Sequence, residues 1–300
     1  MKSRVKTWLT AVRPFAYSAS VVPVVLGTGI AYLEGVFDLV LFILALLASV
    51  LLHTGTNLVN DSFDFIKGVD TQTSYGSSGM ITGGKLTPRQ VHRTGILCFF
   101  LATVIGFYLV IEIGITIMIL GIAGILGGYF YTAKPVQYKY HALGDFLVFF
   151  LMGPLMVWGA YYVQTMAYRL YPLVFSLPVG FLVAAILVAN NIRDIQHDSK
   201  VGIKTVSTLL GFEHSKWEYL LLVSGSFVVI LILVLSRLAS PFLLLAFLAF
   251  PTGYRIMRHV MRTREESAQD LATVDIQSAQ LHLQVGGLMI IGLIVSSFLG

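Results

Sequence analysis

Apolar residues along this chain form long runs separated by short polar segments, with no sustained alternation of the kind that strands show. A hydrocarbon core about 30 Å thick is crossed by roughly 20 apolar residues in a helix. Runs of this kind lie at residues 15–33, 36–57, 95–111, 113–131, 143–163, 172–191, 217–236, 241–259 and 281–299. Gly and Pro within them are tolerated in membrane helices. The pattern predicts an all-α integral membrane protein with nine transmembrane helices arranged as a bundle.

Composition supports this class. Hydrophobic residues make up 56% of the chain and charged residues 12%, and the mean hydropathy is +0.82, which is outside the range of soluble domains. The single cysteine, Cys98, excludes a disulfide or a cysteine-based metal site within the chain. Residues 1–300 are predicted to form one membrane-embedded domain, in which residues 1–14 lie at the interface and residues 58–92 and 192–216 form cytoplasmic loops.

The positive charges are distributed unevenly between the two sides of the predicted bundle. Eighteen of the 20 Lys and Arg residues precede the first apolar run or follow an even-numbered run, and only Arg169 and Arg237 fall on the other side. The positive-inside rule therefore predicts a cytoplasmic N-terminus. Because topology explains the net charge of +5, nucleic acid is not an expected partner, and the lipid bilayer is.

Two of the even-numbered runs end in matched polar segments, NLVNDSFDFIKGVD and NNIRDIQHDSK. At 100° per residue, the polar side chains of each segment lie within about 60–80° of one another on a helix. The two stripes are Asn57, Asp61 and Asp64 in the first segment, and Asn190, Asp194 and Asp198 in the second. Both lie at helix C-termini, where the helix dipole disfavours a carboxylate, so we expect a cation to offset their charge.

Carboxylate and amide oxygens are ligands that Mg²⁺ prefers, and substrate phosphates usually complete its coordination. The two stripes therefore predict a site for a diphosphate held by Mg²⁺. The simpler interpretation is that the acids end the helices and form solvated salt bridges, but two matched stripes at one membrane face favour a functional site. A cation or small-anion transporter is the alternative function. Transporters often have inverted repeats and midplane sites, whereas here both parent helices run in the same direction.

The same segments resemble the two aspartate-rich motifs of the UbiA superfamily of membrane prenyltransferases, whose members have nine transmembrane helices and need Mg²⁺. Three other stretches are similar to the MenA type, 1,4-dihydroxy-2-naphthoate polyprenyltransferase: WLTAVRPFAYSASVVPVVLGTGIAY, ITGGKLTPRQV and YTAKPVQYKYHALGDFLVFFLMGPLMVWGAYYVQT. The similarity covers most of residues 8–211. Asp145 departs from the pattern, which has Glu at this position.

The resemblance implies transfer of a polyprenyl group from polyprenyl diphosphate to an aromatic acceptor, by ionisation to an allylic cation. With 1,4-dihydroxy-2-naphthoate the product is demethylmenaquinone; relatives use 4-hydroxybenzoate, homogentisate or lipid glycerol. Asp61, Asp64, Asp194 and Asp198 are the expected catalytic metal ligands. Asp70, beyond Gly68, either binds metal or holds the loop. The expected substrate-binding residues are Asn57, Asn60, Lys67, Tyr131, Asp145, Asn190, Asn191, Arg193 and Lys204.

Four further features have two interpretations each. Tyr131 and its neighbouring tyrosines could face the acceptor or form an interfacial aromatic belt. Asp145 could contact the acceptor or simply favour a helix N-terminus. His53, one turn before Asn57, is interpreted as a packing residue, although it shares the polar stripe. The Gly-rich segment 76–84 is a candidate lid by its composition and position.

Overall fold

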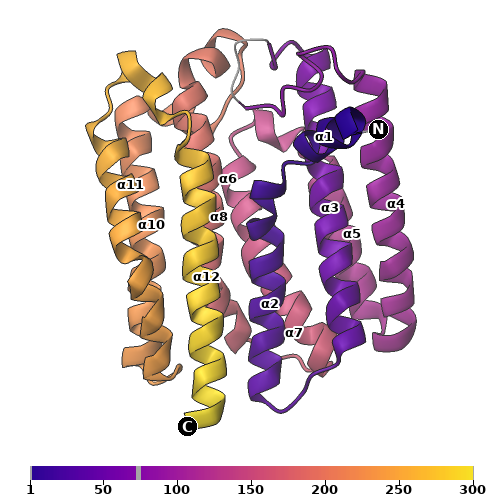
Figure 1. Cartoon of the computed structure of the whole chain (residues 1–300), viewed down its shortest axis with the longest axis vertical. Helices are drawn as coiled ribbons and strands as arrows, with labels where there is room; N and C mark the ends of the chain where they lie inside the picture. Colours follow the sequence, from indigo (N-terminus) through magenta and orange to yellow (C-terminus); the bar gives the residue numbers. More distant parts are fainter. Residues whose placement is uncertain (1, 72–75, 300) are drawn as a thin grey trace.

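In the computed structural model of the chain, every regular element is a helix in the part that the structure describes, residues 2–71 and 76–299 (Figure 1). The first half contains α1 (Lys2–Ala11), η1 (Pro14–Tyr17), α2 (Ser18–Leu33), α3 (Leu39–Ile66), α4 (Pro88–Ile113), α5 (Ile115–Tyr129) and η2 (Tyr138–Tyr140). The middle contains α6 (Gly144–Phe150), the π-helical turn η3 (Leu151–Leu155), α7 (Met156–Thr165) and α8 (Tyr171–Lys200). The last part contains α9 (Val206–Leu210), α10 (Phe212–Leu235), η4 (Pro241–Ala249), α11 (Phe250–Arg262), η5 (Glu265–Leu271) and α12 (Val274–Leu299).

Seven helical segments within the described residues have the length and hydropathy of membrane spans. They are Pro14–Leu33, Leu39–Ile66, Pro88–Ile113, Gly144–Thr165, Tyr171–Lys200, Phe212–Leu235 and Val274–Leu299. Each coincides with a predicted run. The fourth predicted run is the shorter helix α5, and the eighth is divided between η4 and α11. The all-α membrane class is therefore confirmed, and the count of nine crossings stays a prediction.

Side chains that cap the first turn explain where α3 and α4 begin. The Asp38 carboxylate accepts the Leu41 N–H at 2.9 Å and caps α3. Thr87 and Gln90 form a reciprocal capping box before α4, which has Pro88 at its first position. Helices α3 and α8 continue beyond their apolar runs to Ile66 and Lys200, so both polar stripes remain helical.

Small residues allow neighbouring helices to approach closely. A Cβ atom at Gly55 of α3 would lie 3.0 Å from the carbonyl oxygen of Gly95 in α4, and one at Gly95 would lie 3.1 Å from the carbonyl oxygen of Gly55. A Cβ atom at Gly27 of α2 would lie 2.2 Å from the carbonyl oxygen of Val157 in α7. Such contacts are typical of membrane helix pairs, in which packing replaces the hydrophobic effect.

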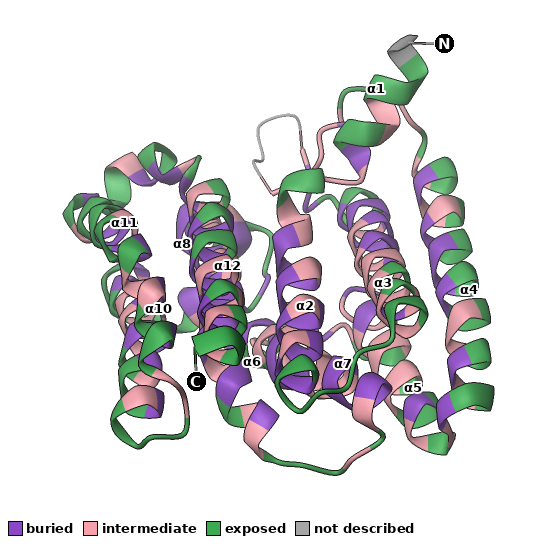
Figure 2. Ribbon diagram, turned by 60° about the horizontal axis from the view of Figure 1, so that its bottom comes forward, coloured by how far each residue is buried: buried purple, intermediate pink, exposed green. Residues whose placement is uncertain are grey.

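The distribution of burial is that of a bundle surrounded by lipid. Large apolar side chains are exposed along the outer side of α4, among them Phe100, Val104 and Ile111 (Figure 2). The main packed core lies instead where α8, α10 and α12 meet, with Ile192, Ile230 and Val285 fully buried. Between these two regions, helices α2 to α8 surround a cavity.

Candidate active site

A cavity of about 600 Å³ extends along the inside of the bundle. On α3 alone its lining runs from Ala45 to Asn60, about 22 Å at 1.5 Å per residue. The body of the cavity is lined by apolar side chains such as Leu109, Ile117 and Leu151. One end, called here the mouth, is polar, and is lined by Asn57, Asn60, Asp70, Asn190, Asn191, Asp194 and Asp198. The arrangement suits an amphiphile with an anionic head and an apolar tail.

The first aspartate of motif one does not itself line the cavity and is covered by a cation that does. Asp61 is 2% exposed and forms an ion pair with Arg13, which precedes α2. Its other oxygen accepts the backbone N–H of Ser78 at 3.2 Å. Asp61 therefore connects the N-terminal segment and the Gly-rich loop to the end of α3.

The second aspartate of motif one contacts the loop between α5 and α6. The Lys139 Nζ lies 2.5 Å from Oδ2 of Asp64, and the Tyr140 hydroxyl donates to Oδ1. Lys139 also donates to the Asn60 amide oxygen at 3.3 Å, and Lys67 lies 3.7 Å from the centre of the Tyr140 ring. Burial alone would lower the pKa of Lys139, but Asp64 together with Tyr131, Tyr140 and Asp70 more than offsets this and raises that pKa well above its usual value.

The second motif is organised around a buried arginine. Arg193 is 6% exposed and donates to both carboxylate oxygens of Asp194, at 2.9 and 2.7 Å. It also donates to the Asn190 amide oxygen at 2.9 Å and to Asp275 of α12 at 3.3 Å. A bidentate guanidinium–carboxylate pair of this kind fixes the orientation of both side chains. Asp198, one turn further along α8, is buried and lines the mouth.

The structure brings the two motifs together, as the sequence predicts. The His197 ring nitrogen Nε2 lies 2.6 Å from the carbonyl oxygen of Val69, which joins α8 to the segment after α3. A Cβ atom at Gly76 would lie 3.3 Å from Oδ2 of Asp194, so the Gly-rich loop passes directly over the second motif. Asp70 is buried between them, and burial, with a smaller contribution from Asp64, raises its pKa to about 7.

Three of the predicted substrate-binding residues lie at different distances from the cavity: Tyr131 lines it, Asp145 lies behind its wall, and Lys204 is exposed. Tyr131 lines the cavity beside the mouth. Asp145 is buried outside the lining, and it accepts a hydrogen bond of 2.9 Å from the Asn191 amide, which does line the mouth. Asp145 therefore holds the side chain of Asn191, and Asn191 is the residue that faces the cavity. Lys204 is exposed, and its described contact is a backbone one, in which its carbonyl oxygen accepts the Ala142 N–H at 2.7 Å.

The candidate lid is packed against the mouth over its described part. Residues 76–84 of the predicted lid are described, whereas residues 72–75 of the same loop lie outside the described residues. Met80 and Ile81 are buried in a small apolar cluster with Ala11, Leu58 and Val91. The loop therefore joins α1, α3 and α4 at the mouth.

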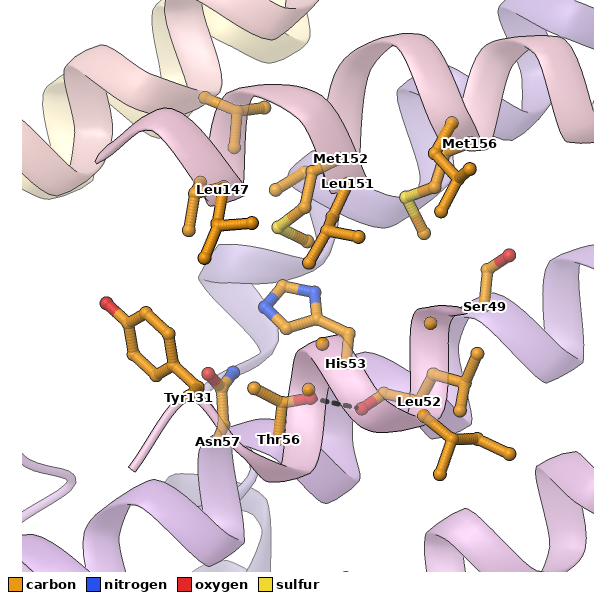
Figure 3. A pocket seen from close by; sticks show the side chains of 18 of the residues that line it. Ser49, Leu52, His53, Thr56, Asn57, Tyr131, Leu147, Leu151, Met152 and Met156 are labelled. Carbon is orange, nitrogen blue, oxygen red and sulfur yellow. Dashed lines mark hydrogen bonds between the residues drawn. The ribbon is translucent and has the colours of Figure 1, made fainter. Parts of the chain in front are cut away.

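Sequence reasoning missed several residues of the site. Arg13 and Lys139 belong to the clusters of basic residues that the predicted topology already explains, so nothing in the sequence distinguishes them from the other loop cations. Asp275 begins α12, far along the chain from both motifs. The sequence favours a packing role for His53, whereas the structure places it in the cavity wall (Figure 3). Its place on the polar stripe of Asn57 is the signal in the sequence that points to the cavity.

The donor set at the mouth fits Mg²⁺ in its chemistry. It consists of carboxylate and amide oxygens, which are the hard ligands that this ion selects. Among the described residues, however, no three acidic, His or Cys side chains already form a metal cage. Asp61, Asp64 and Asp194 are each paired with a cationic side chain instead. These cations are the groups that offset the charge of the two stripes at the helix C-termini.

The fold and the site define a multi-pass helical membrane protein with an internal cavity that has a polar mouth and an apolar body. The chain belongs to the UbiA prenyltransferase family, whose model matches residues 20–280. It is accordingly a prenyltransferase, a transferase enzyme.

Relatives agree with this assignment over nearly the whole chain. The 1,4-dihydroxy-2-naphthoate octaprenyltransferase of Bacillus subtilis is 31% identical over 290 residues, which are 95% of this chain and 91% of that protein. The fold is similar to the apo structure of a UbiA homolog from Aeropyrum pernix K1, with a TM-score of 0.68, 16% identity and coverage of 95% of this chain and 98% of that one. A UbiA homolog from Archaeoglobus fulgidus, bound to GPP and Mg²⁺, matches with a TM-score of 0.60, 15% identity and coverage of 94% and 99%.

Proposed function

We propose that this enzyme transfers a polyprenyl group from polyprenyl diphosphate to 1,4-dihydroxy-2-naphthoate, with loss of diphosphate and carbon dioxide, and so makes demethylmenaquinone in its reduced, hydroquinone form. One observation carries the proposal: a single cavity, which follows α3 for about 22 Å, joins a polar mouth, built from both motifs, to an apolar body. The mouth suits a diphosphate and the body suits a prenyl tail. The same reaction in the Bacillus subtilis relative, by its name, supports the acceptor.

The proposed metal ligands are Asp61, Asp64, Asp194 and Asp198, with Asp70 as a fifth candidate. Asn57, Asn60, Asn190 and Asn191 supply amide groups around the diphosphate, and Lys67, Arg193 and Lys204 supply positive charge to its oxygens. Bound Mg²⁺ stabilises the negative charge that develops on a leaving diphosphate. The presence of GPP and Mg²⁺ in the Archaeoglobus fulgidus homolog supports a prenyl diphosphate and a divalent ion as the ligands.

The chain's own residues contribute charge, orientation and a dry environment. Lys139 and Arg193 lie within hydrogen-bonding distance of the motif carboxylates, where fixed cations stabilise developing negative charge without reorganisation. The apolar body keeps water away from the allylic cation that forms when diphosphate leaves. The acceptor ring then attacks this cation.

The proposed enzyme is one domain with nine transmembrane helices in the cell membrane, with its N-terminus and the mouth facing the cytoplasm. The distribution of Lys and Arg supports this orientation. The cations that contact the motifs, Arg13, Lys139 and Arg193, all come from segments that the charge distribution assigns to the cytoplasmic side.

A direct assay tests the function. Purified protein is incubated with Mg²⁺, a polyprenyl diphosphate and a panel of acceptors that includes 1,4-dihydroxy-2-naphthoate, 4-hydroxybenzoate, homogentisate and a lipid glycerol acceptor, and the products are identified by mass. We expect prenylation of the naphthoate, its loss on chelation with EDTA, and its recovery when Mg²⁺ is added in excess. Product from another acceptor alone would refute the proposed acceptor, and full activity without a divalent ion would refute the proposed role of the metal.

A further inference from the structure

One imidazole lies in the wall of the cavity, deeper than the polar mouth. His53 is one helical turn below Asn57 on α3, about 6 Å further into the bundle, and it lines the cavity. Its Nδ1 lies 2.5 Å from the hydroxyl oxygen of Ser20 in α2, and Ser20 is fully buried. The ring also contacts Tyr17 edge-on, with centroids 5.9 Å apart. The ring is thus held at one nitrogen, while the other remains available to the cavity.

The surroundings of His53 form a small polar patch in a mostly apolar space. Figure 3 shows the His53 ring directed into the cavity, between Leu151 and Met152 on one side and Asn57 on the other, with Tyr131 across the space. The Asn57 side-chain nitrogen is buried and has no hydrogen-bond partner among the described residues. A buried polar group without a partner costs free energy, so a donor and an imidazole side by side indicate a polar ligand.

The prenyl diphosphate accounts for the Asn57 amide at the mouth, but neither of its two parts accounts for the imidazole one turn deeper. The diphosphate belongs at the mouth, with the motif carboxylates and cations, and the prenyl tail has no polar atom. The remaining reactant is the aromatic acceptor, whose ring hydroxyls are the polar groups that must come close to the reacting end of the prenyl chain.

We propose that His53 binds a ring hydroxyl of the aromatic acceptor through Nε2 and takes its proton during transfer, an inference that rests on the proposed function. In the tautomer this requires, Nδ1–H donates to Ser20 Oγ and the Nε2 lone pair faces the cavity. Ser20 is then a positioning residue, because it fixes the tautomer and orientation of a ring that touches substrate.

The transfer conserves the hydroxyl proton and each electron pair. The hydroxyl proton moves to Nε2, and the O–H electron pair enters the ring. A ring carbon conjugated with that oxygen forms a bond to the first prenyl carbon, whose bonding pair has left with the diphosphate oxygen. When the naphthoate loses carbon dioxide, the released pair restores the aromatic ring and the proton returns from Nε2 to oxygen. General base assistance of this kind accelerates reactions about 10²- to 10⁴-fold.

The test combines variants of the enzyme with analogues of the acceptor. His53→Gln, Ser20→Ala and the wild type are assayed with 1,4-dihydroxy-2-naphthoate and with its two monomethyl ethers, each of which lacks one hydroxyl proton. His92→Gln is the matched control, because His92 packs on Phe63 at the start of α4 and does not line the cavity. Binding of labelled prenyl diphosphate with Mg²⁺ is measured for every protein, because His53 is not expected to contact the diphosphate.

We expect His53→Gln to lower kcat/KM for the naphthoate about 100-fold or more, while prenyl diphosphate binding changes less than about threefold. The wild type should discriminate strongly against one of the ethers, and His53→Gln should lose most of this discrimination, a readout that a purely structural role would not affect. Ser20→Ala should lower the rate about tenfold, and His92→Gln should behave as the wild type does.

Each contrary result has a distinct meaning. If His53→Gln keeps the wild-type preference for the hydroxyl over the methoxy group, the inference is wrong. If His53→Gln fails to fold, Ser20→Ala decides, because an unchanged rate and preference in that variant would also overturn it. If the wild type prenylates no aromatic acceptor at all, the proposed function fails instead.

Discussion

The ion pair between Asp64 and Lys139 provides a quantitative test of the first motif. Asp64→Asn removes one charge from a pair with 2.5 Å between Nζ and Oδ2, in which the Asp64 side chain is 2% exposed and the Lys139 side chain 20% exposed. At an effective dielectric constant of ~20, two unit charges at this distance attract each other by about 7 kcal/mol. Desolvation offsets part of this, and loss of one partner from a buried pair costs roughly 3–5 kcal/mol. Because Lys139 is partly exposed, we expect a loss of about 3 kcal/mol in the free energy of unfolding.

A second substitution separates this structural cost from the proposed chemistry. The double variant Asp64→Asn with Lys139→Gln leaves no unpaired buried charge, so its thermal stability in detergent should return most of the way to that of the wild type. Prenyl transfer, measured by product mass, should stay at least about 100-fold below the wild type in both variants, since a ligand and charge-stabilising group is absent.

The pair between Glu213 and Lys216 provides a control. Its Oε2–Nζ distance is 2.8 Å, but the Glu213 side chain is 69% exposed, so Glu213→Gln should change stability by less than about 1 kcal/mol. If Asp64→Asn were as stable as the wild type, the structural part of the reasoning would be wrong. If the double variant recovered transfer, Asp64 would serve only to neutralise Lys139.

Two further predictions concern packing and the support of the mouth. Gly27→Ala should destabilise the protein by about 1–3 kcal/mol, because its Cβ would lie 2.2 Å from the Val157 carbonyl oxygen. Gly29→Ala is the control, since a Cβ there would have no atom within 4 Å and should leave stability unchanged. Equal melting temperatures of the two variants would contradict this prediction. Asp145→Asn can still offer an oxygen to the Asn191 amide, and Asp145→Leu cannot, so the Leu variant should show the larger rise in KM for prenyl diphosphate. Equal effects of the two Asp145 substitutions would mean that the hydrogen bond to Asn191 does not matter.

The sequence was sufficient to predict the membrane class, seven of the spans and the meeting of the two motifs, because long apolar runs and polar stripes are local patterns. It did not show how long some helices are. The fourth predicted span is a 15-residue helix, and the eighth is divided between the 3-10 helix η4 and the α-helix α11. Hydropathy alone does not show where a helix ends or where it changes from 3-10 to α geometry. Packing between helices sets those limits.

The residues that form the mouth are harder to predict from the sequence, because they depend on which loop residues contact the two motifs. Lys204 and Lys139 both lie in predicted cytoplasmic loops, but only Lys139 contacts a motif carboxylate, while Lys204 is exposed. Asp145 follows the helix start as expected, yet its side chain faces Asn191 of α8 and does not line the cavity. Tertiary contacts of this kind join segments 46 to 82 residues apart, and no local pattern encodes them.

The charge balance at the mouth links the binding of metal to that of substrate. Six carboxylates either line it or pair with a cation that does, those of Asp61, Asp64, Asp70, Asp194, Asp198 and Asp275, and four cations lie among them, Arg13, Lys67, Lys139 and Arg193. With all of them ionised, an excess of two negative charges remains, so the mouth alone disfavours a diphosphate. A divalent cation reverses this balance, and we therefore expect the affinity for prenyl diphosphate to rise steeply with Mg²⁺ concentration, as binding of labelled prenyl diphosphate at graded Mg²⁺ would measure. An affinity independent of Mg²⁺ would mean that Arg13, Lys139 and Arg193 turn from the carboxylates to the substrate, and that the acids serve only to hold these cations in place.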